Sequence, residues 1–195
     1  MKNHLDNYFN TLNKTILKLD KEKINQLINE IKKIKLQNGR IFFLGVGGSA
    51  GNASHAVNDF RKICNLECYT PTDNVSEITA RTNDDGFETI FSNYLINSKL
   101  NKKDGIFIFS VGGGNLKHKV SVNLIEAIKL AKKKKSKIFS IVGKKDGYAY
   151  KNSNISILTE VENKKLVTPI TEGLQGVIWH CLVSDKRLQE NKTKW

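Results

Sequence analysis

Four side chains of this 195-residue chain have the types and spacing needed for proton transfer or metal binding. His55 and Asp59 lie four residues apart, and Glu172 and His180 lie eight apart. On a helix, each spacing places both side chains on nearly one face. Two imidazoles and two carboxylates on two helices could bind a divalent metal such as zinc, or could equally serve as acid–base partners. The same spacings are also common in surface ion pairs, so spacing alone leaves these alternatives open.

Two glycine-rich segments each follow a short apolar run. The first is Gly45–Ser49 and the second is Ser110–Asn115. Neither has the Walker A pattern, and the first lacks the third glycine of Gly-x-Gly-x-x-Gly. Glycine lets backbone N–H groups approach an anion, and the N-terminus of a following helix adds a favourable dipole. Two such loops in one small domain predict a phosphate or sugar site.

The apolar pattern predicts the elements that position these residues. Residues 5–36 have helical periodicity with a break at 19–21, which predicts two antiparallel helices. A final helix is expected to begin at Thr168-Pro169 and to run through His180, with Thr168 as its N-cap. Residues 83–87 have the composition of a turn followed by a helix start. Other helices are expected at 50–63 and 119–134, and short strands at 41–44, 67–69, 106–109, 138–142 and 155–158.

Alternating apolar strands and helices predict an α/β fold, a doubly wound, mainly parallel five-stranded sheet with an N-terminal helical pair. No repeat or proline-rich linker divides the chain, so residues 1–195 are expected to form a single domain. Its helical pair (1–38) packs on the α/β core (39–195) or is swapped between subunits.

The charge balance invites comparison with nucleic-acid-binding proteins. The chain has 32 Lys and Arg against 19 Asp and Glu, a net charge of +13. The lysine runs lack interleaved aromatic residues, which indicates a solvated surface that attracts small anions rather than nucleic acid. Three cysteines form no closed disulfide set, and the apolar runs are too short to span a membrane. A cytoplasmic protein without a membrane partner is therefore expected.

Several segments together resemble the sugar isomerase (SIS) domain superfamily and, within it, the phosphoheptose (sedoheptulose 7-phosphate) isomerase family. The resemblance covers essentially the whole chain. It is carried by Gly47–Ser49 with Asn52, Ala53 and His55, by Asn83-Asp84 with Gly86-Phe87, by the Ser110 loop, and by Glu172 with His180.

The resemblance implies roles for particular residues. The acid–base pair would be Asp59 and His180, and a divalent metal, expected to be zinc, would be held by His55, Asp59, Glu172 and His180. The family is typically a homotetramer whose active sites draw on neighbouring subunits. The implied substrate-binding residues are Gly47, Gly48, Ser49, Asn83, Asp84, Ser110, Gly112, Asn115 and Glu172.

The expected reaction is conversion of sedoheptulose 7-phosphate to D-glycero-D-manno-heptose 7-phosphate through an enediol, for heptose in a surface glycan. The chain departs from the family pattern at several positions: Asp59 replaces Glu, Glu172 replaces Gln, Val46 replaces Asn, and the second loop has lost hydroxyl side chains. Two alternatives therefore stay open, namely an isomerase of another phosphosugar and a non-catalytic phosphosugar-binding module.

Overall fold

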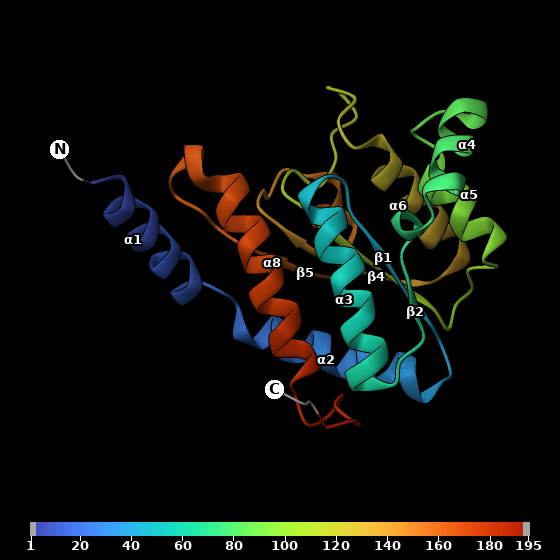
Figure 1. Cartoon of the computed structure of the whole chain (residues 1–195), viewed down its shortest axis with the longest axis horizontal. Helices are drawn as coiled ribbons and strands as arrows, with labels where there is room; N and C mark the ends of the chain where they lie inside the picture. Colours follow the sequence, from blue (N-terminus) through green and yellow to red (C-terminus); the bar gives the residue numbers. More distant parts are fainter. Residues whose placement is uncertain (1–2, 193–195) are drawn as a thin grey trace.

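The computed structural model describes residues 3–192, and a five-stranded sheet forms the centre of this part of the chain (Figure 1). Every neighbouring pair of strands is parallel, and the strand order is β2-β1-β3-β4-β5. All five predicted strands are confirmed. Their bounds are β1 Ile41–Leu44, β2 Cys68–Tyr69, β3 Gly105–Ser110, β4 Lys137–Val142 and β5 Ile155–Leu158.

The central strands β1, β3 and β4 are mostly apolar because both faces of the sheet are covered. Successive side chains of a strand point to opposite faces. Phe43 and Phe107 therefore enter one core, while Phe42 and Ile106 enter the other. The first core lies beneath α2 (Lys21–Leu36), α3 (Gly48–Cys64) and α8 (Val167–Val183), and the second beneath α5 (Ile90–Asn97), α6 (Val122–Lys134) and α7 (Tyr148–Asn152). This arrangement confirms the doubly wound α/β fold.

The N-terminal helices form as predicted but do not lie as predicted. Helix α1 spans His4–Leu17, and α2 packs four buried residues against the sheet. Figure 1 shows α1 extending away from the body instead of lying antiparallel beside α2, so the predicted antiparallel pair is wrong. The apolar face of α2 packs against the sheet and therefore cannot pack against α1. The only buried residues of α1 are Thr11 and Thr15.

The segment between β2 and β3 contains one helix, α4, that the sequence pattern did not predict, and a second, α5, that begins just after the helix start expected at 83–87. A single 3-10 turn, η1 (Pro71–Asp73), leads into α4 (Val75–Asp85), and α5 follows. The expected turn at 83–87 is in fact the end of α4, with Gly86 as its C-cap at φ +84°. Within residues 3–192, no helix is both long and apolar enough to cross a membrane.

Two predicted helix starts are also corrected. Helix α6 begins at Val122 because residues 115–120 form a separate small loop, closed by backbone hydrogen bonds between Asn115 and Val120. Helix α8 begins at Val167, directly after the 3-10 turn η2 (Lys164–Leu166). Thr168 therefore lies inside the first turn of α8 and is not its N-cap.

Candidate functional site

Helices α3 and α8 lie side by side on one face of the sheet, and they bring His55, Asp59 and His180 together (Figure 1). Asp59 Oδ2 lies 3.7 Å from Nε2 of His55 and 3.7 Å from Nε2 of His180. The carboxylate is buried, whereas both imidazoles are exposed to solvent. We call these three residues the His–Asp–His cluster. It is open on its outer side, so a ligand can reach it.

Hydrogen bonds around the cluster leave its facing atoms free to bind. His180 Nδ1 lies 2.8 Å from the Gly176 carbonyl oxygen, which can only accept, so Nδ1 carries the proton and Nε2 keeps its lone pair in the neutral ring. Asp59 Oδ1 accepts a hydrogen bond from Asn58 Nδ2, which leaves Oδ2 toward the histidines. A neutral imidazole lone pair facing a carboxylate oxygen can accept a proton or bind a cation.

The donor set fits a divalent metal ion. One ligand atom from each residue of the cluster lies within 4.8 Å of the others. Ligand atoms around one tetrahedral zinc ion stand about 3.4 Å apart, so the 3.7 Å separations need only a small adjustment. The carbonyl that orients His180 is the kind of outer partner that metal-bound histidines use. Three protein ligands leave a fourth position open.

Glu172 does not join this group within one chain. It lies eight residues before His180 on α8, which corresponds to a rise of about 12 Å along the helix. Its carboxylate instead lies over the N-terminus of α3, where a Cβ on Gly48 would stand only 2.7 Å from Glu172 Oε2. Gly47 precedes this contact with φ +63°, a conformation that favours glycine. Glu172 therefore places a negative charge at the N-terminus of α3, beside the first glycine loop.

A buried amide, which the sequence analysis did not single out, fixes this end of the α3–α8 pair. Gln175 is fully buried and donates from Nε2 to Ser49 Oγ at 3.1 Å. Asn52 Nδ2 donates to Gln175 Oε1 and to the Glu172 carbonyl, each at 2.9 Å. Ser49 therefore serves first to join the helices. The only signal for Gln175 in the sequence was an amide side chain in the mainly apolar second half of the last helix.

The second glycine loop is built by its own hydrogen bonds. Ser110 Oγ accepts from the Gly113 N–H at 2.9 Å, and Asn115 Oδ1 accepts from the His118 N–H at 3.0 Å. The carbonyls of Gly113 and Gly114 accept from N–H groups at the start of α7. These contacts shape the loop and leave Gly112 without a close neighbour at the position of a Cβ.

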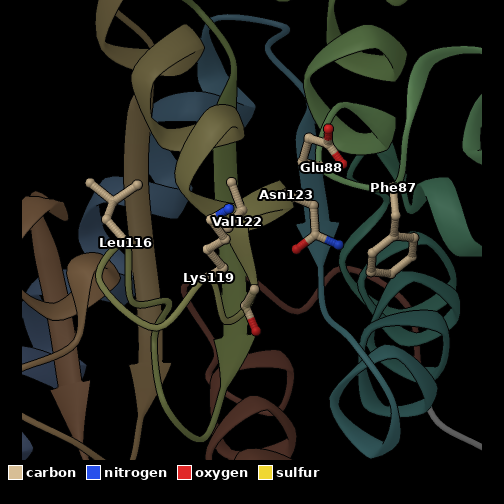
Figure 2. A pocket seen from close by; sticks show the side chains of 7 residues that line it. Phe87, Glu88, Leu116, Lys119, Val122 and Asn123 are labelled. Carbon is tan, nitrogen blue, oxygen red and sulfur yellow. The ribbon is translucent and has the colours of Figure 1, made fainter.

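A cavity of about 620 Å³ opens where this loop meets the N-terminus of α6. We call it the α6 pocket. Asn123 is 1 % exposed, and its Nδ2 has no hydrogen-bond partner among the described residues, while its Oδ1 accepts from the Leu124 N–H. Figure 2 shows Asn123 between Phe87 on one side and Lys119 on the other. The pocket is lined by Phe87, Glu88, Leu116, Lys119, Ser121, Val122 and Asn123.

The α6 pocket offers an anion several favourable groups, beside one carboxylate, Glu88, that opposes an anion. Its side chains include the hydroxyl of Ser121, the ammonium of Lys119 and the free amide of Asn123, and the N-terminus of α6 has no side-chain cap. The sequence analysis missed these residues. Ser121 directly before an apolar helix was the signal that could have identified them.

Two predicted sugar-contacting residues lie apart from the His–Asp–His cluster. Asn83 and Asp84 occupy the last turn of α4, both exposed, and Asn83 Nδ2 donates to Asp84 Oδ1 at 2.8 Å. They are close in sequence to Phe87 and Glu88 of the α6 pocket. Their contact with a sugar stays a prediction.

Comparisons with known proteins agree with this fold. The SIS domain family matches residues 6–143. The chain is 32% identical to the phosphoheptose isomerase of Haemophilus ducreyi over 134 residues, 65% of this chain and 66% of that protein. It is 28% identical to the lincomycin biosynthesis protein LmbN of Streptomyces lincolnensis over 150 residues, 74% of this chain, and so spans about half (54%) of that relative. The solved structure of phosphoheptose isomerase GmhA from Neisseria gonorrhoeae has the same fold, with TM-score 0.78 and 22% identity over 92% of this chain and 93% of that chain.

Proposed function

We propose that this chain, a member of the SIS domain family, acts as a phosphosugar isomerase on a seven-carbon sugar phosphate. The proposed reaction converts sedoheptulose 7-phosphate to D-glycero-D-manno-heptose 7-phosphate. The observation that carries the proposal is the His–Asp–His cluster, because a buried carboxylate facing two solvent-exposed imidazoles is suited to moving protons on a bound sugar.

Asp59 and His180 are the proposed proton carriers. A base removes a proton from C1 of the ketose, and its electron pair forms the C1=C2 bond of an enediol whose O2 gains a proton. A proton is then returned to C2 while the C1 hydroxyl loses its own and becomes the aldehyde. His180 Nε2 has the free lone pair for the first step, because Nδ1–H donates to the Gly176 carbonyl. Asp59 holds the resulting imidazolium by charge.

A divalent metal, proposed to be zinc, fits the cluster. His55 Nε2, Asp59 Oδ2 and His180 Nε2 are the atoms that could hold it. The lone pair of His180 Nε2 cannot bind the ion and accept a sugar proton at the same time, so His55 and Asp59 would hold the ion during proton transfer. Glu172 would join only after leaving its position over Gly48. When bound, the ion supplies a Lewis acid for the oxygens of the sugar. His55 then acts as a ligand that orients rather than transfers protons.

The sugar phosphate is proposed to bind at the second glycine loop and the α6 pocket. Ser121, Lys119 and the free amide of Asn123 support this assignment, as does the absence of a side-chain cap on α6. Gly47, Gly48 and Glu172 are proposed to contact hydroxyl groups.

A homotetramer with shared active sites is also proposed. The His–Asp–His cluster lies on the face covered by α3 and α8, and the α6 pocket lies on the face covered by α5 and α6. A neighbouring copy would complete each site. The exposed apolar side chains Leu5, Phe9 and Leu17 on α1 support such an interface. A cytoplasmic role in supplying heptose for a surface glycan is part of the same proposal.

The test follows the hydrogen at C1 and C2 by NMR in deuterated water. With zinc-loaded protein and sedoheptulose 7-phosphate, we expect deuterium exchange and appearance of the aldose. Asp59→Asn and His180→Ala are each expected to lower kcat at least about 100-fold, since each removes a proton carrier. Ser121→Ala is expected to raise KM several-fold and to change kcat little, because it touches only the phosphate site.

His4→Gln is the matched control, since His4 is an exposed histidine on α1, outside the cluster. It should retain wild-type turnover. No exchange with wild-type protein, together with unchanged phosphosugar binding by His180→Ala, would rule out the isomerase assignment for this substrate and favour a binding module. Exchange with another phosphosugar alone would instead correct the substrate.

A further inference from the structure

One aromatic side chain touches both histidines of the His–Asp–His cluster. The indole of Trp179 stacks on the His180 imidazole, with ring centroids 3.5 Å apart and planes 29° apart. The same indole meets the His55 ring edge-on at 4.7 Å and 64°. Trp179 is 1 % exposed, whereas about half of each histidine side chain is exposed. A buried ring therefore lies behind two solvent-exposed imidazoles.

The two histidines differ in what else holds them. His180 is fixed by its hydrogen bond to Gly176. Among the hydrogen bonds of residues 3–192, none reaches the His55 ring, whose other polar neighbour is Asp59 Oδ2 at 3.7 Å. An exposed side chain without such a bond exchanges between rotamers. The nearest ring against His55 is Trp179 at 4.7 Å, with His180 farther away at 5.5 Å, so Trp179 is the main contact that limits the orientation of His55.

The indole itself is poorly matched to a purely structural role. Trp179 Nε1 is buried and has no hydrogen-bond partner among the described residues. Buried tryptophans usually find one, and leaving a donor unpaired opposes folding. A residue that only filled space in α8 would avoid this cost. The ring is thus better explained by what it contacts on its faces and edges.

We propose that Trp179 is a positioning residue that holds the His55 and His180 imidazoles with Nε2 toward Asp59. The inference rests on the proposed function of the cluster, but it concerns only the orientation of its ligands. A correctly oriented pair of imidazoles binds a metal ion more tightly and transfers protons faster, because the geometry exists before the ligand arrives.

The test compares Trp179→Leu, which removes the aromatic ring, with Trp179→Phe, which keeps one. The first measurement needs neither substrate nor metal: side-chain couplings and ring contacts of His55 and His180 by NMR of histidine-labelled protein. We expect rotamer averaging of His55 in Trp179→Leu and partial restoration in Trp179→Phe. The second measurement is the dissociation constant for Zn²⁺ alone, by competition with a chromophoric chelator. It should rise at least about tenfold in Trp179→Leu and less in Trp179→Phe.

Leu174→Ala is the control, because Leu174 is a fully buried α8 residue of the same core. It should lower thermal stability while leaving the histidine couplings and Zn²⁺ binding as in the wild type. The proposal is overturned if Trp179→Leu retains a single His55 rotamer and wild-type Zn²⁺ affinity, or if Leu174→Ala weakens both equally. Failure of sedoheptulose 7-phosphate as substrate would leave the NMR result standing, so the two failures are distinguishable.

Discussion

The three cysteines differ in burial and therefore in reactivity. Cys64 and Cys68 are buried, and Cys181 is exposed on α8. Burial raises the pKa of the Cys64 thiol to about 12 and that of Cys68 well above its usual value. The reactive species of a cysteine is the thiolate, so both buried cysteines stay protonated and unreactive at neutral and mildly alkaline pH.

We therefore expect iodoacetamide to modify native protein once, at Cys181. Intact-mass measurement followed by peptide mapping checks both the number and the place of the adduct. Cys181→Ser should give no rapid adduct, and urea-unfolded protein should accept three. Modification of Cys64 in the folded protein as fast as Cys181 would contradict the assignment.

For individual residues, the sequence could predict contacts between side chains of the same helix. The four-residue spacing placed His55 beside Asp59, as found. The meeting of Asp59 with His180 was implied only by family resemblance, because it requires the packing of α3 on α8. Helical phase also placed Glu172 near the face of His180 but ignored the rise between them. The positions of Gln175 and Trp179 depend on tertiary contacts that no local pattern reports.

At the scale of elements, an ion pair whose carboxylate is buried connects the N-terminal ends of the neighbouring strands β1 and β3. Asp104 directly precedes β3 and is 1 % exposed. It forms an ion pair with Arg40, which directly precedes β1. Its Oδ1 accepts from the Arg40 backbone N–H at 3.0 Å, and its Oδ2 accepts from Arg40 Nη2 at 2.8 Å. The carboxylate raises the pKa of Arg40, so the pair stays charged.

Asp104→Ala is expected to lower the free energy of unfolding by about 3 kcal/mol, because it leaves the Arg40 guanidinium and a backbone N–H without their acceptor. Urea titration followed by circular dichroism measures the change. Glu162→Ala is the comparison, since its ion pair with Lys18 is exposed and its loss should not shift the midpoint measurably. Equal effects of the two substitutions would show that Asp104 has no special role.

The central strands could be predicted because each contains a short, mostly apolar run buried on both faces. Helix α4 could not, since none of its residues is buried in the chain and its sequence carries no core-facing stripe. The predicted antiparallel pair failed for a related reason. A short break predicts a turn, but the direction after it is set by the surface that each helix covers, and α2 covers the sheet.

For the whole molecule, the net charge of +13 is spread over surface lysines rather than gathered at the site. The His–Asp–His cluster contains no lysine, and the α6 pocket contains Lys119 alone. The charge thus favours approach of a phosphorylated sugar in general, while recognition depends on a few neutral donors. The net charge does not explain a second surface feature, which is the group of exposed apolar side chains on α1.

Helix α1 carries an apolar stripe that the chain does not cover. Leu5, Phe9 and Ile16 follow one helical face, with exposures of 58 %, 62 % and 39 %. Tyr8 and Leu12 are partly buried against the main core and border this stripe, whose three residues stay exposed. An exposed apolar surface of this kind is typical of an interface between subunits.

Phe9→Glu is therefore expected to dissociate the proposed homotetramer, because it would bury a charge at the centre of the stripe. Light scattering after size-exclusion chromatography should give the mass of four chains for the wild type and a smaller species for Phe9→Glu. Leu36→Glu, at an exposed leucine outside α1, should keep the wild-type mass. If neighbouring copies complete each active site, isomerase activity should fall with the tetramer. A monomeric wild type, or a Phe9→Glu protein that keeps four chains, would show that the α1 stripe does not hold subunits together.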